Sequence, residues 1–126
     1  MIVDSSAVAA IFFRRPGYER LIDALARAGG AGIGAPTLAE AALEIGAAAG
    51  RDAQGLVARF VQEFHLAVIP FGDAHSRAAA DAHRRFGSGR AALDLGECLA
   101  YATARLAKQP LLADDPRFAA TDLELA

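Results

Sequence analysis

Short apolar segments alternate with amphipathic helical segments along this chain, and that alternation restricts the folds available to it. The run Leu66-Ala67-Val68-Ile69-Pro70-Phe71 is short, continuously apolar and partly β-branched, and it predicts a strand buried on both faces. Shorter segments predict further strands over residues 2–3, 31–35 and 110–113, with a weak final strand over 121–125. Helical spacing of apolar residues predicts helices over residues 7–13, 21–28, 37–49, 52–64, 73–86 and 94–108. Ser5 or Ser6 is the predicted N-cap of the first of these helices. This order indicates an α/β fold, in which helices cover both faces of a mostly parallel sheet of four to five strands.

The chain is long enough for one domain only. Its 126 residues, 54% of them apolar and 22% charged, suit a single folded unit over residues 1–126. The helices predicted over 37–49 and 52–64 are separated only by a short break at Gly50. We therefore expect them to form a protruding helical hairpin.

Charge and cysteine content exclude several classes of protein. The formal net charge of −2 gives no overall positive field for non-specific binding of nucleic acid. The single cysteine, Cys98, forms no internal disulfide and, with three scattered histidines, supplies no structural zinc site. No uncharged run is long enough to cross a membrane, and an acid, Asp4, precedes the first apolar run. We expect a cytoplasmic protein without a membrane partner.

Carboxylates cluster at one predicted edge of the sheet. Ligands bind beyond the carboxyl ends of the strands in open parallel sheets, and acids follow three of these strands at Asp4, Glu40 and Asp115, which stands beside Asp114. Asp94 and Glu97 open the helix that returns to the last of these strands, which brings them to the same edge. Such carboxylates repel one another unless a hard cation lies between them. Mg²⁺ or Mn²⁺ at this place would suit hydrolysis of a phosphodiester.

Each acid also has a structural explanation. Glu40 completes a capping box with Thr37, Asp94 is a good N-cap with Glu97 near the positive end of the helix dipole, and Asp114-Asp115-Pro116 suits a turn. Asp4 is harder to explain in this way, because a charge in a strand fit for burial is costly unless it is paired or bound to metal.

Several segments resemble the PIN-domain ribonucleases, in particular the VapC-type toxins of VapBC toxin–antitoxin systems. The opening Met1-Ile2-Val3-Asp4-Ser5-Ser6-Ala7 is similar to the family's MIVDTSA, and the block Leu93-Asp94-Leu95-Gly96-Glu97-Cys98-Leu99-Ala100-Tyr101-Ala102 is similar to LNxGDCFAYA. The segments 36–40, 86–90 and 110–123 also match family segments. The resemblance covers nearly the whole chain and implies a three-layer α/β/α PIN-like fold.

The resemblance also implies the roles of individual residues. Asp4, Glu40 and Glu97 correspond to catalytic, metal-binding acids, and Ser6 supports them through its hydroxyl. The third acid is glutamate where the family usually has aspartate, so Asp94 is a candidate to share the metal. The family's acid just before the final phenylalanine is Arg117 here, which leaves the fourth ligand to Asp115 or Asp114. We favour Asp115, which fits the TxDxxF form of other PIN domains.

A VapC-type toxin would be a Mg²⁺- or Mn²⁺-dependent endoribonuclease acting on tRNA or rRNA, dimeric, and inhibited by a VapB-type antitoxin. Five arginines are candidates to line the path of the RNA, and the alternative is that they are solubilising surface charges: Arg14, Arg15, Arg84, Arg85 and Arg90. Aromatic residues at helical spacing are candidates for the antitoxin contact or for the core: Phe12, Phe13, Phe60 and Phe64. The alternative function is a PIN-like binding module with weak or no catalysis, because the fourth acid is displaced.

Overall fold

A four-stranded, all-parallel sheet forms the centre of the molecule. The structure is a computed structural model that describes residues 1–126, and its sheet has the strand order β3-β2-β1-β4. The strands are β1 (Ile2–Val3), β2 (Ala31–Gly34), β3 (Leu66–Ile69) and β4 (Leu111–Leu112). Ile2 pairs with Gly32 on one side and with Leu111 on the other, which puts β1 in the middle of the sheet.

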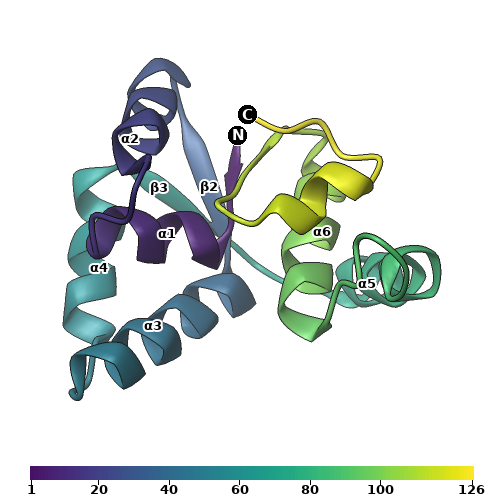
Figure 1. Cartoon of the computed structure of the whole chain (residues 1–126), viewed down its shortest axis with the longest axis horizontal. Coiled ribbons are helices and arrows are strands. Elements are labelled where there is room, and N and C mark those ends of the chain that lie inside the picture. Colours follow the sequence, from purple (N-terminus) through teal and green to yellow (C-terminus); the bar gives the residue numbers. More distant parts are fainter.

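Helices cover both faces of this sheet and give the predicted three-layer α/β/α arrangement (Figure 1). One face carries α1 (Ser5–Phe12), α2 (Tyr18–Arg27), α3 (Ala35–Ala49) and α4 (Gln54–Glu63). The other carries α5 (Asp73–Phe86), α6 (Leu95–Ala107) and the short 3₁₀ helix η1 (Pro116–Ala120). The helical hairpin is confirmed as α3 and α4, which contact each other. None of the helices has the length and apolar character needed to cross a lipid bilayer.

The period of two in the strands divides the core into two clusters. Val3 and Leu112 point into the cluster beneath α1 to α4, whereas their neighbours Ile2 and Leu111 point into the cluster beneath α5 and α6. All four side chains are buried. The central strands are therefore anchored from both faces, and β1 ends at a fixed point immediately before Asp4.

Three sequence predictions about strands and helix ends are wrong. Residues 66–71 do not form a strand buried on both faces, because β3 is an edge strand and Val68 is 46% exposed. Residues 121–125 form no strand, because the chain bends over residues 121–123 and pairs with β4 only in a single bridge between Leu125 and Leu111. Neither Ser5 nor Ser6 caps the first helix, since Asp4 takes the N-cap position and its carboxylate accepts the amide hydrogen of Ser6.

The remaining predicted elements are present with small shifts at their ends. The helices predicted over 73–86 and 94–108 are α5 and α6. The C-cap of helix α6 is Lys108, which has the left-handed conformation, and only Gln109 and Pro110 lie between this cap and β4. Because α6 must turn back so quickly, its first turn lies at the carboxyl edge of the sheet, as predicted.

Candidate active site

Asp4 lies at the centre of the acidic edge, directly after β1. Its side chain is 3% exposed, and its Oδ2 accepts hydrogen bonds from the backbone N–H of Ser6 at 3.0 Å and from the Ser6 hydroxyl at 2.5 Å. Its second oxygen, Oδ1, is buried and has no hydrogen-bond partner. Burial raises the pKa of Asp4, and the charge of Glu40 raises it further, while the hydrogen bonds from Ser6 lower it.

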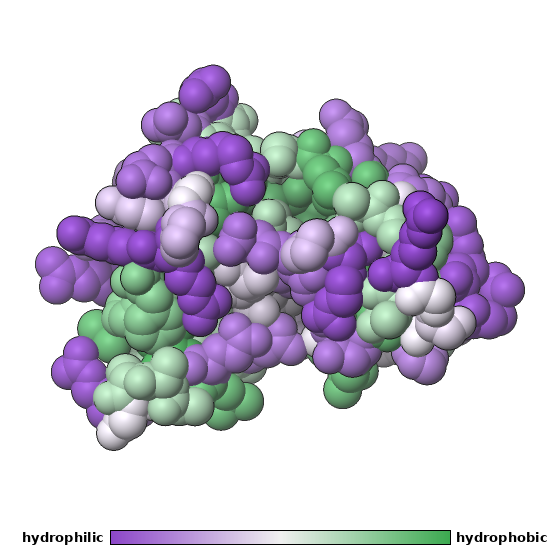
Figure 2. Space-filling view, viewed as in Figure 1, coloured by the Kyte–Doolittle hydropathy of each residue, from purple (hydrophilic) through white to green (hydrophobic).

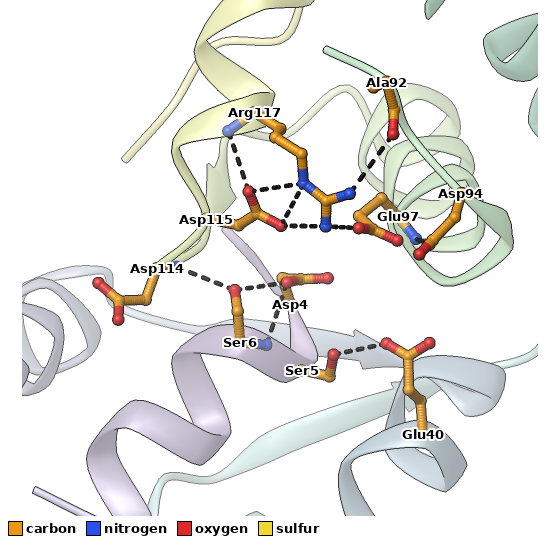
Figure 3. Close-up of polar contacts among 10 residues, drawn as sticks. All are labelled: Asp4, Ser5, Ser6, Glu40, Ala92, Asp94, Glu97, Asp114, Asp115 and Arg117. Carbon is orange, nitrogen blue, oxygen red and sulfur yellow. Dashed lines mark hydrogen bonds and ion pairs between the residues drawn. The ribbon is translucent and has the colours of Figure 1, made fainter. Parts of the chain in front are cut away.

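Two serines at the start of α1 connect Asp4 to its surroundings. The hydroxyl oxygen of Ser6 accepts the backbone N–H of Asp114 at 2.9 Å, which ties the segment after β4 to the start of α1. The hydroxyl of Ser5 donates to Oε1 of Glu40 at 2.5 Å. Ser6 therefore orients the carboxylate of Asp4 itself, and Ser5 orients the carboxylate of Glu40 beside it (Figure 3).

Glu40 reaches this edge from α3, and the capping-box explanation for it is wrong. Helix α3 begins at Ala35 after the N-cap Gly34, so Thr37 lies inside the helix and its buried hydroxyl oxygen has no partner. The carboxylate of Glu40 lies against Gly96 in the first turn of α6. A Cβ atom at position 96 would overlap that carboxylate, so the glycine allows α3 and α6 to bring their acids together.

Helix α6 presents Glu97 from its first turn, while Asp94 caps the helix. Glu97 is 8% exposed. Asp94 is exposed, and its Oδ1 accepts the backbone N–H of Glu97 at 3.5 Å, the N-cap arrangement expected from its sequence position. The carboxylate of Asp94 is thus engaged at the helix end, beside the acid cluster.

Asp115 faces the cluster, and Asp114 points away from it (Figure 3). Both oxygens of Asp115 are occupied by Arg117: its Nη2 lies 2.7 Å from Oδ2, and its Nε lies 3.1 Å from each oxygen. Nη2 also forms an ion pair with Glu97. Position 117, where the family usually carries an acid, is therefore occupied by a cation, which pairs with two of the predicted acids, Glu97 and Asp115.

Matches to known proteins cover almost the whole chain. The family model described as PIN domain matches residues 1–124. Ribonuclease VapC36 of Mycobacterium tuberculosis is 42% identical over 127 residues, which cover 98% of this chain and 91% of the relative. Ribonuclease VapC of Mycolicibacterium smegmatis is 30% identical over 125 residues, with 98% and 97% of the two chains covered. The chain belongs to the VapC ribonuclease family of PIN domains.

Solved structures have the same fold at low sequence identity. VapC20 of Mycobacterium tuberculosis, described as a sarcin-ricin loop cleaving toxin, is similar with a TM-score of 0.79 and 16% identity, covering 99% of this chain and 97% of the other. A toxin-antitoxin complex from Klebsiella pneumoniae gives 0.74 and 15%, covering 99% and 95%. The family and fold predicted from the sequence are confirmed.

The acids of this PIN domain have the donor chemistry of a site for a hard cation. The unpartnered Oδ1 of buried Asp4 and the carboxylates of Glu40 and Glu97 offer the oxygen ligands that Mg²⁺ and Mn²⁺ prefer. In the present arrangement, no three His, Cys, Asp or Glu side chains are close enough to hold one ion. Two of the predicted acids, Glu97 and Asp115, pair with Arg117 in this arrangement.

Sequence reasoning missed two residues that lie beside the predicted acids. Glu44 lies one helical turn after Glu40, and partial burial together with the charges of Glu40 and Asp4 raises its pKa, while Arg15 lowers it. The spacing of four residues from Glu40 was the available signal. Gly96 was also missed, although it matches the glycine of the family segment LNxGDCFAYA, because its contact with a carboxylate from another helix is visible only in the structure.

The five predicted RNA-contacting arginines lie in two groups. Arg14 and Arg15 are exposed after α1. Arg84 pairs with Asp81 at 2.7 Å, and Arg85 pairs with Asp122 at 3.0 Å. Arg90 has no ion pair and lines a surface hollow together with Arg85, Ser88 and Pro116. Hydrophilic side chains gather between α1 and the C-terminal segment, where the acids lie (Figure 2).

The four aromatic candidates for the antitoxin contact divide between core and surface. Phe60 is buried, Phe12 and Phe64 pack partly buried against the core, and Phe13 is 36% exposed. A separate apolar groove lies between α3 and α4, and its lining includes Leu38, Leu43 and Val57.

Proposed function

We propose that this protein is a Mg²⁺- or Mn²⁺-dependent endoribonuclease that acts as the toxin of a toxin–antitoxin pair. Asp4, Glu40, Glu97 and Asp115 are its proposed catalytic and metal-binding acids, with Asp94 as a further candidate ligand. The observation that carries the proposal is the unpartnered Oδ1 of Asp4. A buried carboxylate oxygen without a donor is costly, and a bound cation would offset that cost.

The chemistry that such a cation supplies when bound is polarisation of the phosphodiester, orientation of water and stabilisation of the charge that develops on the reacting oxygens. Two serines of the chain orient the carboxylates that would bind this cation. The hydroxyl of Ser6 occupies one oxygen of Asp4 and leaves the other free. The hydroxyl of Ser5 fixes the carboxylate of Glu40 through Oε1. These hydroxyls hold the carboxylates of Asp4 and Glu40 in place before the cation binds.

RNA is the proposed substrate, and basic residues on both sides of the acids support it. Arg15 is close enough to Glu44 to influence its pKa, and Arg90 lines a hollow that reaches Pro116, next to Asp115. We propose that Arg14, Arg15, Arg84, Arg85 and Arg90 contact phosphates, which position an RNA without reading its sequence. A folded loop of tRNA or rRNA is the expected target, and the protein is expected to act in the cytoplasm.

The proposed partners are a VapB-type antitoxin and a second copy of the chain. The Klebsiella pneumoniae structure of this fold is a toxin-antitoxin complex, and a VapBC2 structure from Rickettsia felis has a TM-score of 0.70 at 14% identity over 99% and 96% of the chains. The apolar groove between α3 and α4 is a surface that a partner helix would cover.

The decisive experiment is cleavage of total RNA by purified protein freed of any antitoxin. We expect discrete fragments with Mg²⁺ or Mn²⁺ that disappear with EDTA and with Asp4→Ala. End-mapping of the fragments then identifies the target. Cleavage that survives both EDTA and Asp4→Ala contradicts the proposed mechanism.

A PIN-like binding module without catalysis is the second candidate function. The ion pairs of Arg117 with Glu97 and Asp115 favour it, because both acids are engaged by the chain itself. Folded protein that binds RNA, does not cleave it, and gains no thermal stability from millimolar Mn²⁺ would support this alternative.

A further inference from the structure

Arg117 takes the place of a cation within the acid cluster. We propose that its guanidinium is a built-in competitor of the divalent cation for Glu97 and Asp115, so that the metal binds only when this guanidinium leaves. The inference rests on the proposed metal-dependent function and concerns what controls metal binding there.

The contacts of Arg117 are those of a resident cation rather than of a surface side chain. Its Nη2 lies between Oε1 of Glu97 and Oδ2 of Asp115, and its Nε binds both oxygens of Asp115 at 3.1 Å (Figure 3). The side chains of Glu97 and Asp115 are only 11% and 16% exposed. A permanently charged, forked guanidinium that pairs with two largely buried carboxylates forms strong, oriented hydrogen bonds.

The acids on the other side of the cluster have no such partner. Asp4 and Glu40 accept hydrogen bonds from Ser5 and Ser6, and no cationic side chain forms an ion pair with either. The cluster is therefore divided into a half neutralised by Arg117 and a half that lacks a positive charge. A divalent ion that draws ligands from both halves needs Glu97 or Asp115 to exchange the guanidinium for the ion.

The position of Arg117 permits this exchange. Its side chain is 38% exposed, and it extends from η1, a short surface element after β4. Beyond its pairs with the two acids, its only other side-chain hydrogen bond runs from Nη1 to the backbone oxygen of Ala92, at 3.4 Å. The guanidinium can therefore move toward solvent without disturbing the core. The ion pairs stabilise the metal-free protein and must break when the metal binds. By linkage, the free energy that they contribute to the metal-free protein is subtracted from the free energy of metal binding.

The test is a titration of the metal-free protein with Mn²⁺, followed by calorimetry or by the electron spin resonance of free Mn²⁺. We expect Arg117→Gln to bind Mn²⁺ at least about tenfold more tightly than the wild type, and Arg117→Lys to lie between the two, because a point charge cannot form the fork. Arg20→Gln is the matched control: Arg20 lines a hollow with Asp114 and Asp115 but forms no ion pair with them. Its affinity should stay within about twofold of the wild type, since exposed charges not in contact are screened.

Thermal unfolding supplies a second readout. Arg117→Gln should unfold at a lower temperature than the wild type in EDTA and gain a larger shift from Mn²⁺. Equal or weaker Mn²⁺ binding by Arg117→Gln overturns the inference and leaves the proposed function intact. If Arg117→Gln does not fold without metal, Arg117→Lys decides, and wild-type affinity in that variant overturns the inference. Absence of Mn²⁺ binding in every variant overturns the metal-dependent function, and the inference with it.

Discussion

The carboxylate of Glu40 on α3 lies directly against Gly96 on α6, so closely that a methyl group at position 96 would overlap it. The contact sets the distance between two helices that each contribute an acid to the site. We expect Gly96→Ala to displace Glu40 or the first turn of α6, and to lower the cleavage rate by roughly 100-fold, the usual cost of misplacing a reacting group by about 1 Å. RNA cleavage under single-turnover conditions measures this effect.

The control for that variant is Gly55→Ala in α4, where an added Cβ would meet nothing within 4 Å. Alanine replaces glycine in a helix in both variants and gains up to about 1 kcal/mol of helix propensity. Gly55→Ala should therefore be as stable as the wild type or more stable, with unchanged cleavage. Equal activity in the two variants would show that the Glu40–Gly96 contact is unimportant.

The variant Asp4→Asn tests separately how much stability the buried charge of Asp4 costs and how much this carboxylate contributes to RNA cleavage. The pKa of Asp4 is raised in the folded protein by burial, so its ionisation removes stability as the pH rises through that pKa. In EDTA we expect Asp4→Asn to be more stable than the wild type at neutral pH, with a difference that shrinks near pH ~4, the ordinary pKa of an aspartate. Asparagine keeps the N-cap, but cleavage should fall by roughly 1000-fold, because several kcal/mol of metal-based stabilisation are lost.

Thermal unfolding in EDTA between acidic and neutral pH checks the first part, and single-turnover cleavage checks the second. Asp73→Asn is a suitable control, because Asp73 is exposed on α5 and pairs only with Arg77. A metal-free Asp4→Asn protein that is less stable than the wild type at neutral pH would contradict the argument from burial.

Comparison of Glu97→Gln with Asp94→Asn decides which acid of α6 acts in catalysis. Glu97 is buried and paired with Arg117, whereas Asp94 is exposed and caps the helix. We expect Glu97→Gln to lose cleavage nearly as completely as Asp4→Asn. Asp94→Asn should keep at least about a third of the activity, since asparagine caps helices as well as aspartate does. The reverse order of activities would assign the metal to Asp94.

The C-terminal segment is held to α5 and α6 by Asp122, and this attachment should depend on pH. Asp122 accepts a 2.7 Å hydrogen bond from Tyr101 and pairs with Arg85 at 3.0 Å. Partial burial opposes its ionisation, but these contacts lower its pKa overall. A lowered pKa contributes stability above the ordinary pKa of aspartate, and this contribution is lost as the pH falls toward the lowered value.

We therefore expect Asp122→Asn to be less stable than the wild type at neutral pH and to approach it below pH ~4. Urea unfolding at several pH values measures the difference. Asp23→Asn is the comparison, because Asp23 is exposed and forms only a 3.6 Å pair with Arg27, which contributes little. Parallel pH profiles for the wild type and Asp122→Asn would refute the role of this contact.

Local patterns in the sequence determined most of the fold. Apolar spacing and the breaks at glycine and proline indicate each helix within a few residues, and the two-residue period of Ile2-Val3 and Leu111-Leu112 places alternate side chains on opposite faces of the sheet. The short connection between α6 and β4 even placed Glu97 at the edge that holds Asp4. These features depend on backbone geometry and on burial along a few consecutive residues, which a sequence records directly.

Only the tertiary structure decided which partner each exposed or charged group meets. The apolar run 66–69 suits a central strand as well as an edge strand, and the order of the strands made it an edge. Position 117 differs from the family's pattern in the sequence, but its pairing with Glu97 and Asp115 follows from how η1 packs beside α6. The physical reason is the same in both cases: contacts between residues distant in the chain depend on how whole elements pack, and no local period encodes that packing.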